Sequence, residues 1–245
     1  MSFRDWRRAA AILAIPALLA LSTTPALAIS GLKSKAPAVS PADFQAPPNA
    51  CDDPAYRLLG GKWKTTLRWR FQSSSSPEEY TVAAVLDVIK RSFNNMTGAR
   101  NDCGLPDNVS ATSSYRGSTT SAPNVTKRGY CKPRDSKNVV GFGPLPDGIL
   151  AVTCTWTNGK GGMVESDVRV NSNMYWALTV GSCHYWQELL EPTITHEIGH
   201  AFGLGHVGEK KHGRLTMSTT SDGPCDNAET TLGLGDIEGL HHLYP

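Results

Sequence analysis

The sequence lacks an excess of charge of either sign, because 24 lysines and arginines are nearly balanced by 22 aspartates and glutamates. This balance argues against the clustered basic surface on which nucleic-acid binding depends. No Cys-x-x-Cys pair is present, so nothing indicates a thiolate zinc site, and no internal repeat is found. The composition that remains, 40% hydrophobic residues and 23 glycines in 245, is that of a globular protein.

Residues 1–28 have the pattern of a secretory signal peptide. Three arginines precede an apolar run at residues 9–21, and Ala26-Leu27-Ala28 then supplies the small-x-small pattern at which signal peptidase cuts. The run is thirteen residues long and contains Pro16, so it is too short to span a membrane. We expect residues 1–28 to be removed and the mature protein to be secreted and extracellular.

The expected mature chain begins with a stretch rich in proline and alanine. Residues 29–50 contain only scattered apolar side chains and cannot bury a core. We predict that they form a flexible leader or a short propeptide. Residues 51–245 are predicted to form the folded domain.

All six cysteines follow the predicted signal peptide, in the part of the chain that would reach an oxidising compartment. An even number and the absence of metal-binding spacing predict three disulfides. Six cysteines allow fifteen pairings, and their spacing does not choose among them. The working hypothesis pairs Cys103 with Cys131, Cys154 with Cys183, and Cys51 with Cys225.

Hydrophobic patterning in the first half of this domain predicts one strand and one helix. Residues 63–71 alternate between apolar and polar side chains, as in a half-buried strand. Ser76 and Pro77 are typical of a helix start, and Gly98 of a helix end, with an apolar stripe between them. Residues 99–137, which are mostly small and polar, are predicted to form a long surface loop held by a disulfide.

The second half of the domain predicts three strands followed by two helices. The strands are expected at residues 138–143, 149–157 and 163–171, with a hairpin connection at residues 158–162. One helix follows Pro192, and a shorter one lies near the end of the chain. This order of elements indicates a single α+β domain with a mixed sheet.

Three histidines in one short stretch form a predicted metal site. His196 and His200 are four residues apart, so on a helix their imidazoles project from the same face. Gly203 permits a positive φ that ends the helix, and His206 can then return to the same ion. Three neutral imidazoles leave the fourth position of zinc to water, which is the arrangement of a catalytic zinc site.

Glu197 lies beside this set of ligands and is the predicted catalytic residue. It is adjacent to His196 and need not bind the metal, so it can act as general base towards a zinc-activated water. The expected reaction is hydrolysis of a peptide bond, with Glu197 passing the proton to the leaving amine.

The stretch from His196 to His206, HEIGHAFGLGH, resembles the HExxHxxGxxH motif of the metzincin zinc endopeptidases. Met217 lies eleven residues after His206, where metzincins carry the methionine of a tight turn beneath the zinc. The chain ending and residues 164–171 further resemble the last helix and the cleft-bordering strand of matrixins. The resemblance implies a metzincin-like zincin domain with a twisted mixed sheet, an active-site helix and a small C-terminal subdomain.

Some positions depart from the matrixin pattern. Asp236 matches the aspartate that supports the methionine turn, but Gly235 stands where matrixins have the aspartate that binds a new N-terminus. Acid-rich calcium loops are not evident, so we expect no calcium. The sequence that begins at Cys103 resembles the cysteine switch of matrixin propeptides, but it follows the first predicted helix instead of preceding the catalytic domain. Cys51 would be better placed to act as such a switch. The even number of cysteines favours a disulfide, and not a free thiol, for both residues.

The leading prediction is therefore a secreted zinc metalloendopeptidase that binds one catalytic zinc ion and acts on extended polypeptide substrates. We expect a monomer with no nucleic-acid partner and no membrane association after signal removal. The first alternative is a catalytically silent zinc-binding module that recognises extracellular proteins. The second is a hydrolase of cell-wall polymers, for which no appended binding domain is seen.

Overall fold

The computed structural model describes residues 27–28, 32–33, 49–221 and 223–245. Most of the predicted signal peptide and of the 29–50 leader therefore lies outside the described residues. Residues 27 and 28, at the expected end of the signal peptide, form a short strand. Residues 32 and 33, in the expected leader, lie against the folded body.

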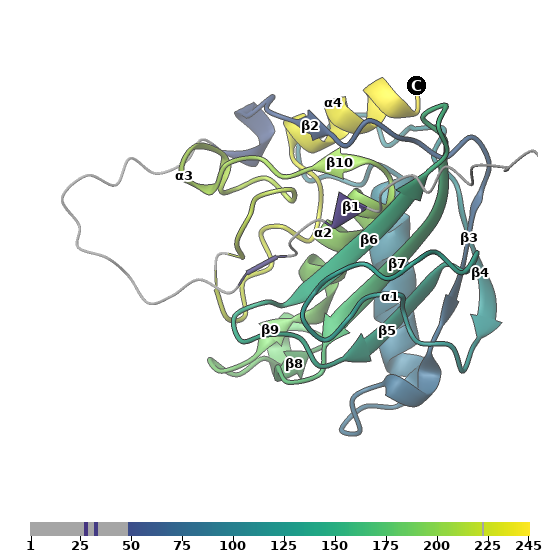
Figure 1. Cartoon of the computed structure of the whole chain (residues 1–245). Coiled ribbons are helices and arrows are strands. Elements are labelled where there is room, and N and C mark those ends of the chain that lie inside the picture. The colour runs from purple at the N-terminus through teal and green to yellow at the C-terminus, as the bar shows by residue number, and fades with distance from the viewer. Residues whose placement is uncertain (1–26, 29–31, 34–48, 222) are drawn as a thin grey trace, which may run out of the picture.

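A mixed sheet forms the centre of the molecule (Figure 1). In order across the sheet, its strands are β1 (Leu27–Ala28), β6 (Ala151–Thr157), β7 (Met163–Asn171), β5 (Val139–Gly143), β3 (Leu67–Phe71) and β4 (Ser113–Ser118). The strands from β7 to β4 are parallel, whereas β6 is antiparallel to β7 and to β1. The predicted hairpin between the last two long strands is confirmed.

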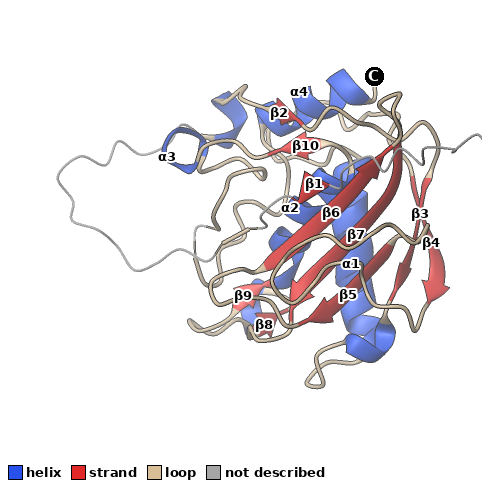
Figure 2. Cartoon of the chain, viewed as in Figure 1, coloured by secondary structure: helices blue, strands red, loops and turns tan. Residues whose placement is uncertain are grey.

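The helices of the described residues are α1 (Val82–Thr97), α2 (Leu190–Ala201), α3 (Glu209–His212) and α4 (Leu234–Leu243). Figure 2 shows α1 and α2 behind the sheet, where they pack against each other. The core lies in this layer: the rings of Trp69 and Phe93 stack with centroids 4.2 Å apart, beside the fully buried Ile194 and Ile198 of α2. The predicted α+β class is confirmed.

Shorter elements connect these layers. The 3-10 helices are η1 (Ala50–Asp52), η2 (Ser73–Ser75) and η3 (Val180–Ser182). Two further pairs of short strands join β2 (Arg57–Leu58) to β10 (Leu204–Gly205), and β8 (Trp176–Ala177) to β9 (Glu188–Leu189). Among the described residues, no helix is both long and apolar enough to cross a membrane.

The first long helix begins later than the sequence predicted. Its N-cap is Thr81, whose hydroxyl accepts the Ala84 N–H at 3.2 Å, and not Ser76. Ser76 follows η2, so its backbone N–H is already bonded to Ser73. The predicted end is correct, because the Gly98 N–H donates to Asn94 O at 2.9 Å.

Two strand predictions also need correction. The strand expected from residue 63 begins only at Leu67, because residues 63–66 turn into the sheet. The long loop predicted at residues 99–137 contains β4. This strand has no apolar alternation, since it lies at the sheet edge and is held by parallel pairing with β3.

Three disulfides are confirmed, but the pairing hypothesis is wrong at every bond. The structure joins Cys51 to Cys103, Cys131 to Cys154, and Cys183 to Cys225. Each bond joins segments that the fold brings together; for example, Cys131 lies in a loop and Cys154 in strand β6. The spacing of the cysteines in the sequence does not predict such tertiary contacts. All six cysteines are bonded, so neither Cys103 nor Cys51 is a free thiol.

A candidate metal site at helix α2

The three predicted histidines converge on one point. His196 and His200 are fully buried on α2, and their Nε2 atoms lie 3.0 and 2.9 Å from His206 Nε2. The predicted positive φ at Gly203 is confirmed at 102°. A Cβ at Gly203 would lie 2.4 Å from Gly61 O, so both conformation and close packing require glycine there. This turn brings His206 back to the helix.

Hydrogen bonds on the far side of two rings fix which nitrogen faces the centre. Nδ1–H of His196 donates to Thr216 O at 2.6 Å, and Nδ1–H of His200 donates to Leu204 O at 2.9 Å. Because a carbonyl can only accept, the proton of each neutral ring is on Nδ1 and the lone pair of Nε2 points inward. The set is therefore ready to bind a cation.

Burial keeps these imidazoles neutral. Desolvation lowers the pKa of His196 to about 3 and that of His206 to about 4, and it lowers the pKa of His200 well below its usual value. Three neutral imidazoles whose Nε2 atoms meet at one point match the ligand set of a metal ion. The group His196, His200 and His206 could thus hold a metal, as the sequence predicted.

Glu197 is fully buried beside the histidines. Its Oε1 accepts the Leu32 backbone N–H at 3.3 Å, and its Oε2 lies 2.5 Å from the Thr153 hydroxyl. Burial raises the pKa of Glu197 to about 7, although both of these hydrogen bonds oppose the shift. Thr153 belongs to β6, so the strand that borders the site is β6. The interior strand β7, which contains residues 164–171, was wrongly assigned to that position.

Met217 lies in a tight turn against helix α2. The Ser218 N–H closes the turn on Leu215 O at 2.9 Å, and the methionine side chain is buried. A Cβ at Gly199 would lie 2.3 Å from Met217 Sδ. The sulfur therefore packs on the helix between the positions of the two helical histidines, in contact with a residue that can only be small.

Asp236 of α4 holds this turn in place. Its Oδ2 accepts the Thr216 N–H at 2.9 Å and its Oδ1 accepts the Met217 N–H at 3.2 Å, as the resemblance implied. Thr216 O in turn accepts the proton of His196 Nδ1. One chain of hydrogen bonds thus runs from Asp236 of α4 through Thr216 to the ring of His196. Burial raises the pKa of Asp236 to about 6.

Gly235 is glycine for a steric reason. A Cβ at this position would lie 2.0 Å from Ala55 O, and the Gly235 N–H donates to Asp53 O at 2.8 Å. Residues 53–55 therefore occupy the space beside α4 that a longer side chain would need. An aspartate that binds a free N-terminus could not be accommodated here.

A second cluster of potential ligands was not predicted. Asp135, Glu165 and Asp167 bring carboxylate oxygens within 4.8 Å of one another, so this group could also hold a cation. The sequence signal for it was weak: Glu165 and Asp167 are separated by one residue in an apolar strand, so both side chains lie on one face of β7. The expectation that calcium is not bound stays a prediction.

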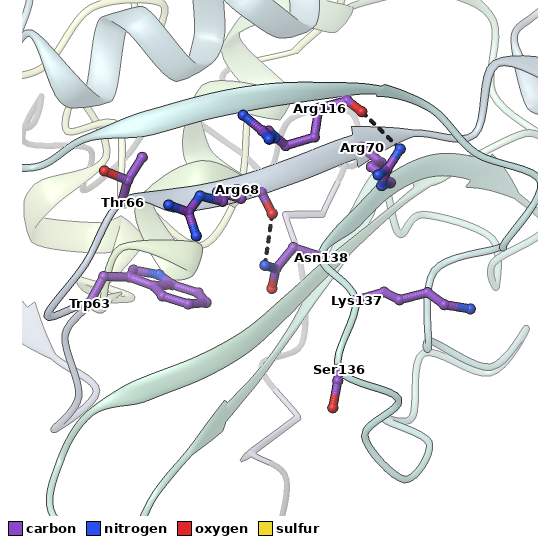
Figure 3. Close-up of a pocket in the computed structure, with 8 residues that line it drawn as sticks. All are labelled: Trp63, Thr66, Arg68, Arg70, Arg116, Ser136, Lys137 and Asn138. Carbon is purple, nitrogen blue, oxygen red and sulfur yellow. Dashed lines mark hydrogen bonds between the residues drawn. The ribbon is translucent and has the colours of Figure 1, made fainter.

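A basic surface pocket lies at the other edge of the sheet, away from the histidines. It is lined by residues of β3, β4 and neighbouring loops, among them Arg68, Arg70, Arg116 and Lys137 (Figure 3). Arg70 donates to Arg116 O at 2.8 Å, and Asn138 donates to Arg68 O at 2.9 Å. None of the predicted site residues lines this pocket.

No protein-family model and no curated protein matches the chain. What can be said of its chemistry therefore depends on the site itself.

Proposed function

We propose that the protein is a zinc-dependent endopeptidase of the metzincin type, most similar to matrixins. The observation that carries the proposal is the convergence of three neutral imidazoles, two of them held by backbone carbonyls, beside a fully buried glutamate. A purely structural zinc site is usually closed by four protein ligands, whereas this one offers three.

Zinc bound by His196, His200 and His206 would supply a Lewis acid with one open coordination position. Glu197 would take a proton from the attacking water and deliver it to the amine that leaves. The Thr153 hydroxyl and the Leu32 N–H fix the direction of its carboxylate, since each donates to one of its two oxygens. Substrates would be extended polypeptides that pair with the side of β6 on which β1 lies in this structure.

The fold supports this proposal without depending on a family match. A mixed sheet with helices behind it and a helix that carries two of the histidines are among the features that the resemblance implied. Three disulfides are typical of proteins in oxidising compartments, which is consistent with secretion. We propose that the mature protein acts outside the cell.

The test compares wild type with Glu197→Gln in two measurements, zinc content by elemental analysis and hydrolysis of casein. We expect one zinc per chain in both proteins and hydrolysis by the wild type alone. The control is Glu191→Gln, the same change on the same helix, at a residue that pairs with Arg91 at 2.8 Å. This control should retain both zinc and hydrolysis.

Other outcomes separate the alternatives. Zinc in all three proteins with hydrolysis in none, after removal of any segment that covers the site, would favour the silent protein-recognition module. Hydrolysis that persists in Glu197→Gln would remove the assigned role of this residue. A wild type without zinc or another bound divalent metal would contradict the proposed function.

A further inference from the structure

The alternation of strand β3 places two arginines on the face of the sheet that bears the basic pocket. Every second side chain of β3 is buried, and the exposed positions between them are Arg68 and Arg70. Arg68 pairs with Ser114 of β4, and Arg116 follows two residues later, so it lines the same pocket. Three guanidinium groups therefore share one exposed face of the sheet.

Hydrogen bonds fix the floor and one wall of this pocket. Asn138 donates to Arg68 O at 2.9 Å, and its Oδ1 accepts the Ser166 N–H at 2.8 Å, so it joins β3 to β7. The indole N–H of Trp63 donates to Ala201 O, at the end of α2, at 2.8 Å. The fold itself thus holds the pocket open, and its volume of about 350 Å³ is within the range of ligand sites.

Two of the four cations in the pocket already have partners. Arg70 donates to Arg116 O at 2.8 Å. The ammonium group of Lys137 lies 3.6 Å from the Asp135 carboxylate. Among the described residues, no ion pair joins Arg68 or Arg116 to a carboxylate. The guanidinium groups of these two arginines are therefore available to an anion from outside the chain.

These two available guanidinium groups extend to the same side of the pocket. Figure 3 shows them directed towards the side where Thr66 and Trp63 lie, whereas Lys137 points the other way. The Thr66 hydroxyl accepts a hydrogen bond from Thr112 Oγ1 at 3.0 Å, so its own proton can be donated. Guanidinium groups match carboxylates in shape and charge. With the indole as an apolar wall, this side of the pocket suits an acidic side chain.

The pocket lies beside an edge of the sheet. β4 is the last strand, and no strand of the described residues pairs with its other side. The Leu67 N–H donates to Thr112 O at 3.0 Å, so Thr112 faces β3. Backbone groups alternate along a strand, so those of Ser113 and Tyr115 face away from β3. An extended peptide can pair with such an edge, whereas a nucleic acid or a polysaccharide has no matching backbone.

We propose that β4 and the basic pocket bind an extended acidic segment of a polypeptide. Its backbone pairs with the edge of β4, and its carboxylates meet Arg68 and Arg116. Strands β7 and β5 separate this site from β6, which borders the histidine set. The inference goes beyond the proposed function, because it names acidic polypeptides as the partners of a second site, whether or not they are cut at the histidines.

The first test measures the affinity of a fluorescein-labelled peptide of alternating glutamate and threonine by fluorescence anisotropy. The protein is full-length Glu197→Gln, so that the probe stays intact. We expect this peptide to bind and its affinity to fall as salt is added, because the contacts are between exposed charges. A control peptide with glutamine at every glutamate position should not bind.

The matched variants remove two positive charges from different places. Arg68→Gln combined with Arg116→Gln should weaken binding of the acidic peptide by roughly 2- to 30-fold, as expected for two exposed ion pairs. The control combines Lys210→Gln with Lys211→Gln in α3, which Figure 1 shows on the other side of the molecule from β4. The control should bind with unchanged affinity.

The second test is amide hydrogen exchange at the edge of β4. The acidic peptide should slow exchange at Ser113 and Tyr115, because their N–H groups would donate to the added strand. A single-stranded oligothymidylate of the same charge should bind less tightly and slow neither amide. This readout separates pairing with a polypeptide from attraction of any anion.

Each contrary outcome has a defined meaning. Equal affinity for the two peptides, or for the arginine and lysine variants, would overturn the proposal. Oligothymidylate that binds as tightly as the acidic peptide, with neither amide slowed by the peptide, would show a site for charge alone. Absence of binding, together with aggregation of the arginine variant, would show that the arginines only protect the edge strand. None of these readouts uses zinc or hydrolysis, so this inference and the proposed function can fail separately.

Discussion

The two clusters of potential metal ligands differ in what their surroundings do to them. The histidine set is held from outside, because backbone carbonyls accept the protons of His196 and His200 and leave lone pairs that point inward. In the acidic cluster, backbone N–H groups point at the carboxylates themselves: Glu165 accepts from Asp135 and Ser136, and Asp167 accepts from Val139 at 2.8 Å. The first arrangement prepares a cation site, whereas the second fastens a loop to strand β7.

The comparison shows that ligand type and proximity do not define a metal site by themselves. Both sets bring three side chains within 4.8 Å, and both are largely buried. The direction of the neighbouring hydrogen bonds separates them, because a lone pair that already accepts an N–H is less available to a cation. Variants of the two clusters should therefore respond differently to metal and to pH.

The largest effect is expected for His200→Ala. Loss of one of three imidazoles should abolish stoichiometric zinc binding and reduce casein hydrolysis to background, because two ligands no longer enclose the ion. Elemental analysis and hydrolysis measure both. The control His184→Ala alters an exposed histidine that stacks on Trp186, and it should retain both properties; full zinc occupancy in His200→Ala would contradict the assignment.

Asp236→Asn should weaken the site without removing a ligand. The amide of asparagine cannot accept all of the hydrogen bonds that Asp236 now accepts from the N–H groups of Thr216, Met217 and Gly233. The Thr216 carbonyl that orients the His196 ring would therefore be held less firmly. We expect zinc affinity or hydrolysis to fall by about 10–100-fold. Competition with a chelator would measure the affinity, and Asp87→Asn, at a side chain that is 67% exposed, serves as the control.

Gly199→Ala tests the packing beneath the histidine set. The new Cβ would lie 2.3 Å from Met217 Sδ, so either the methionine or the helix must shift. We expect a loss of about 1–3 kcal/mol in the free energy of unfolding, measured with denaturant. The control is Gly181→Ala, whose new Cβ has no atom within 4 Å and should change the stability little. Equal stability of the two variants would show that Met217 can move away from the new Cβ at no measurable cost.

The acidic cluster should give the smallest effect, and one that depends on pH. Burial raises the pKa of Asp167 to about 8 from 3.8, so the folded state holds a proton that the unfolded state releases. Stability from this group is present below pH 4, decreases as pH rises, and is lost above about pH 8. The slope for one proton is about 1.4 kcal/mol per pH unit.

Asp167→Asn should flatten this part of the profile of unfolding free energy against pH. The groups that face Asp167 are Glu165 and Asp135, which raise its pKa further, and Arg134 lies 3.8 Å from Glu165. Asp135→Asn is the control, since this side chain is 36% exposed and should change the slope less. An unchanged slope in Asp167→Asn would assign the pH dependence to other groups.

The histidine set could be predicted because its geometry is local. One helical turn relates His196 to His200, and one glycine returns the chain to His206, so the sequence contains the whole arrangement. The neighbours that complete it could not be predicted in this way. Thr153 comes from β6 and Leu32 from a segment that was expected to be flexible, and both reach Glu197 only through tertiary structure.

The same reason explains the errors in the fold. The positions of strands β5, β6 and β7 and the end of α1 at Gly98 depend on neighbouring residues in the sequence, and they were predicted well. The beginning of α1 depended on a choice between Ser76 and Thr81, which η2 decided. The acidic cluster joins a loop residue, Asp135, to strand β7 across about thirty positions of sequence, and no local pattern connects them.

The order of the disulfides has a consequence for how an exported chain folds. The six cysteines are bonded in consecutive pairs along the sequence, the first with the second (Cys51 and Cys103), the third with the fourth, and the fifth with the sixth (Cys183 and Cys225). A chain that crosses a membrane with its N-terminus leading exposes the correct partner of every cysteine before any competitor arrives. Oxidation in the order of emergence would yield the native set directly, so maturation would require an oxidant for its thiols but little reshuffling of bonds by an isomerase.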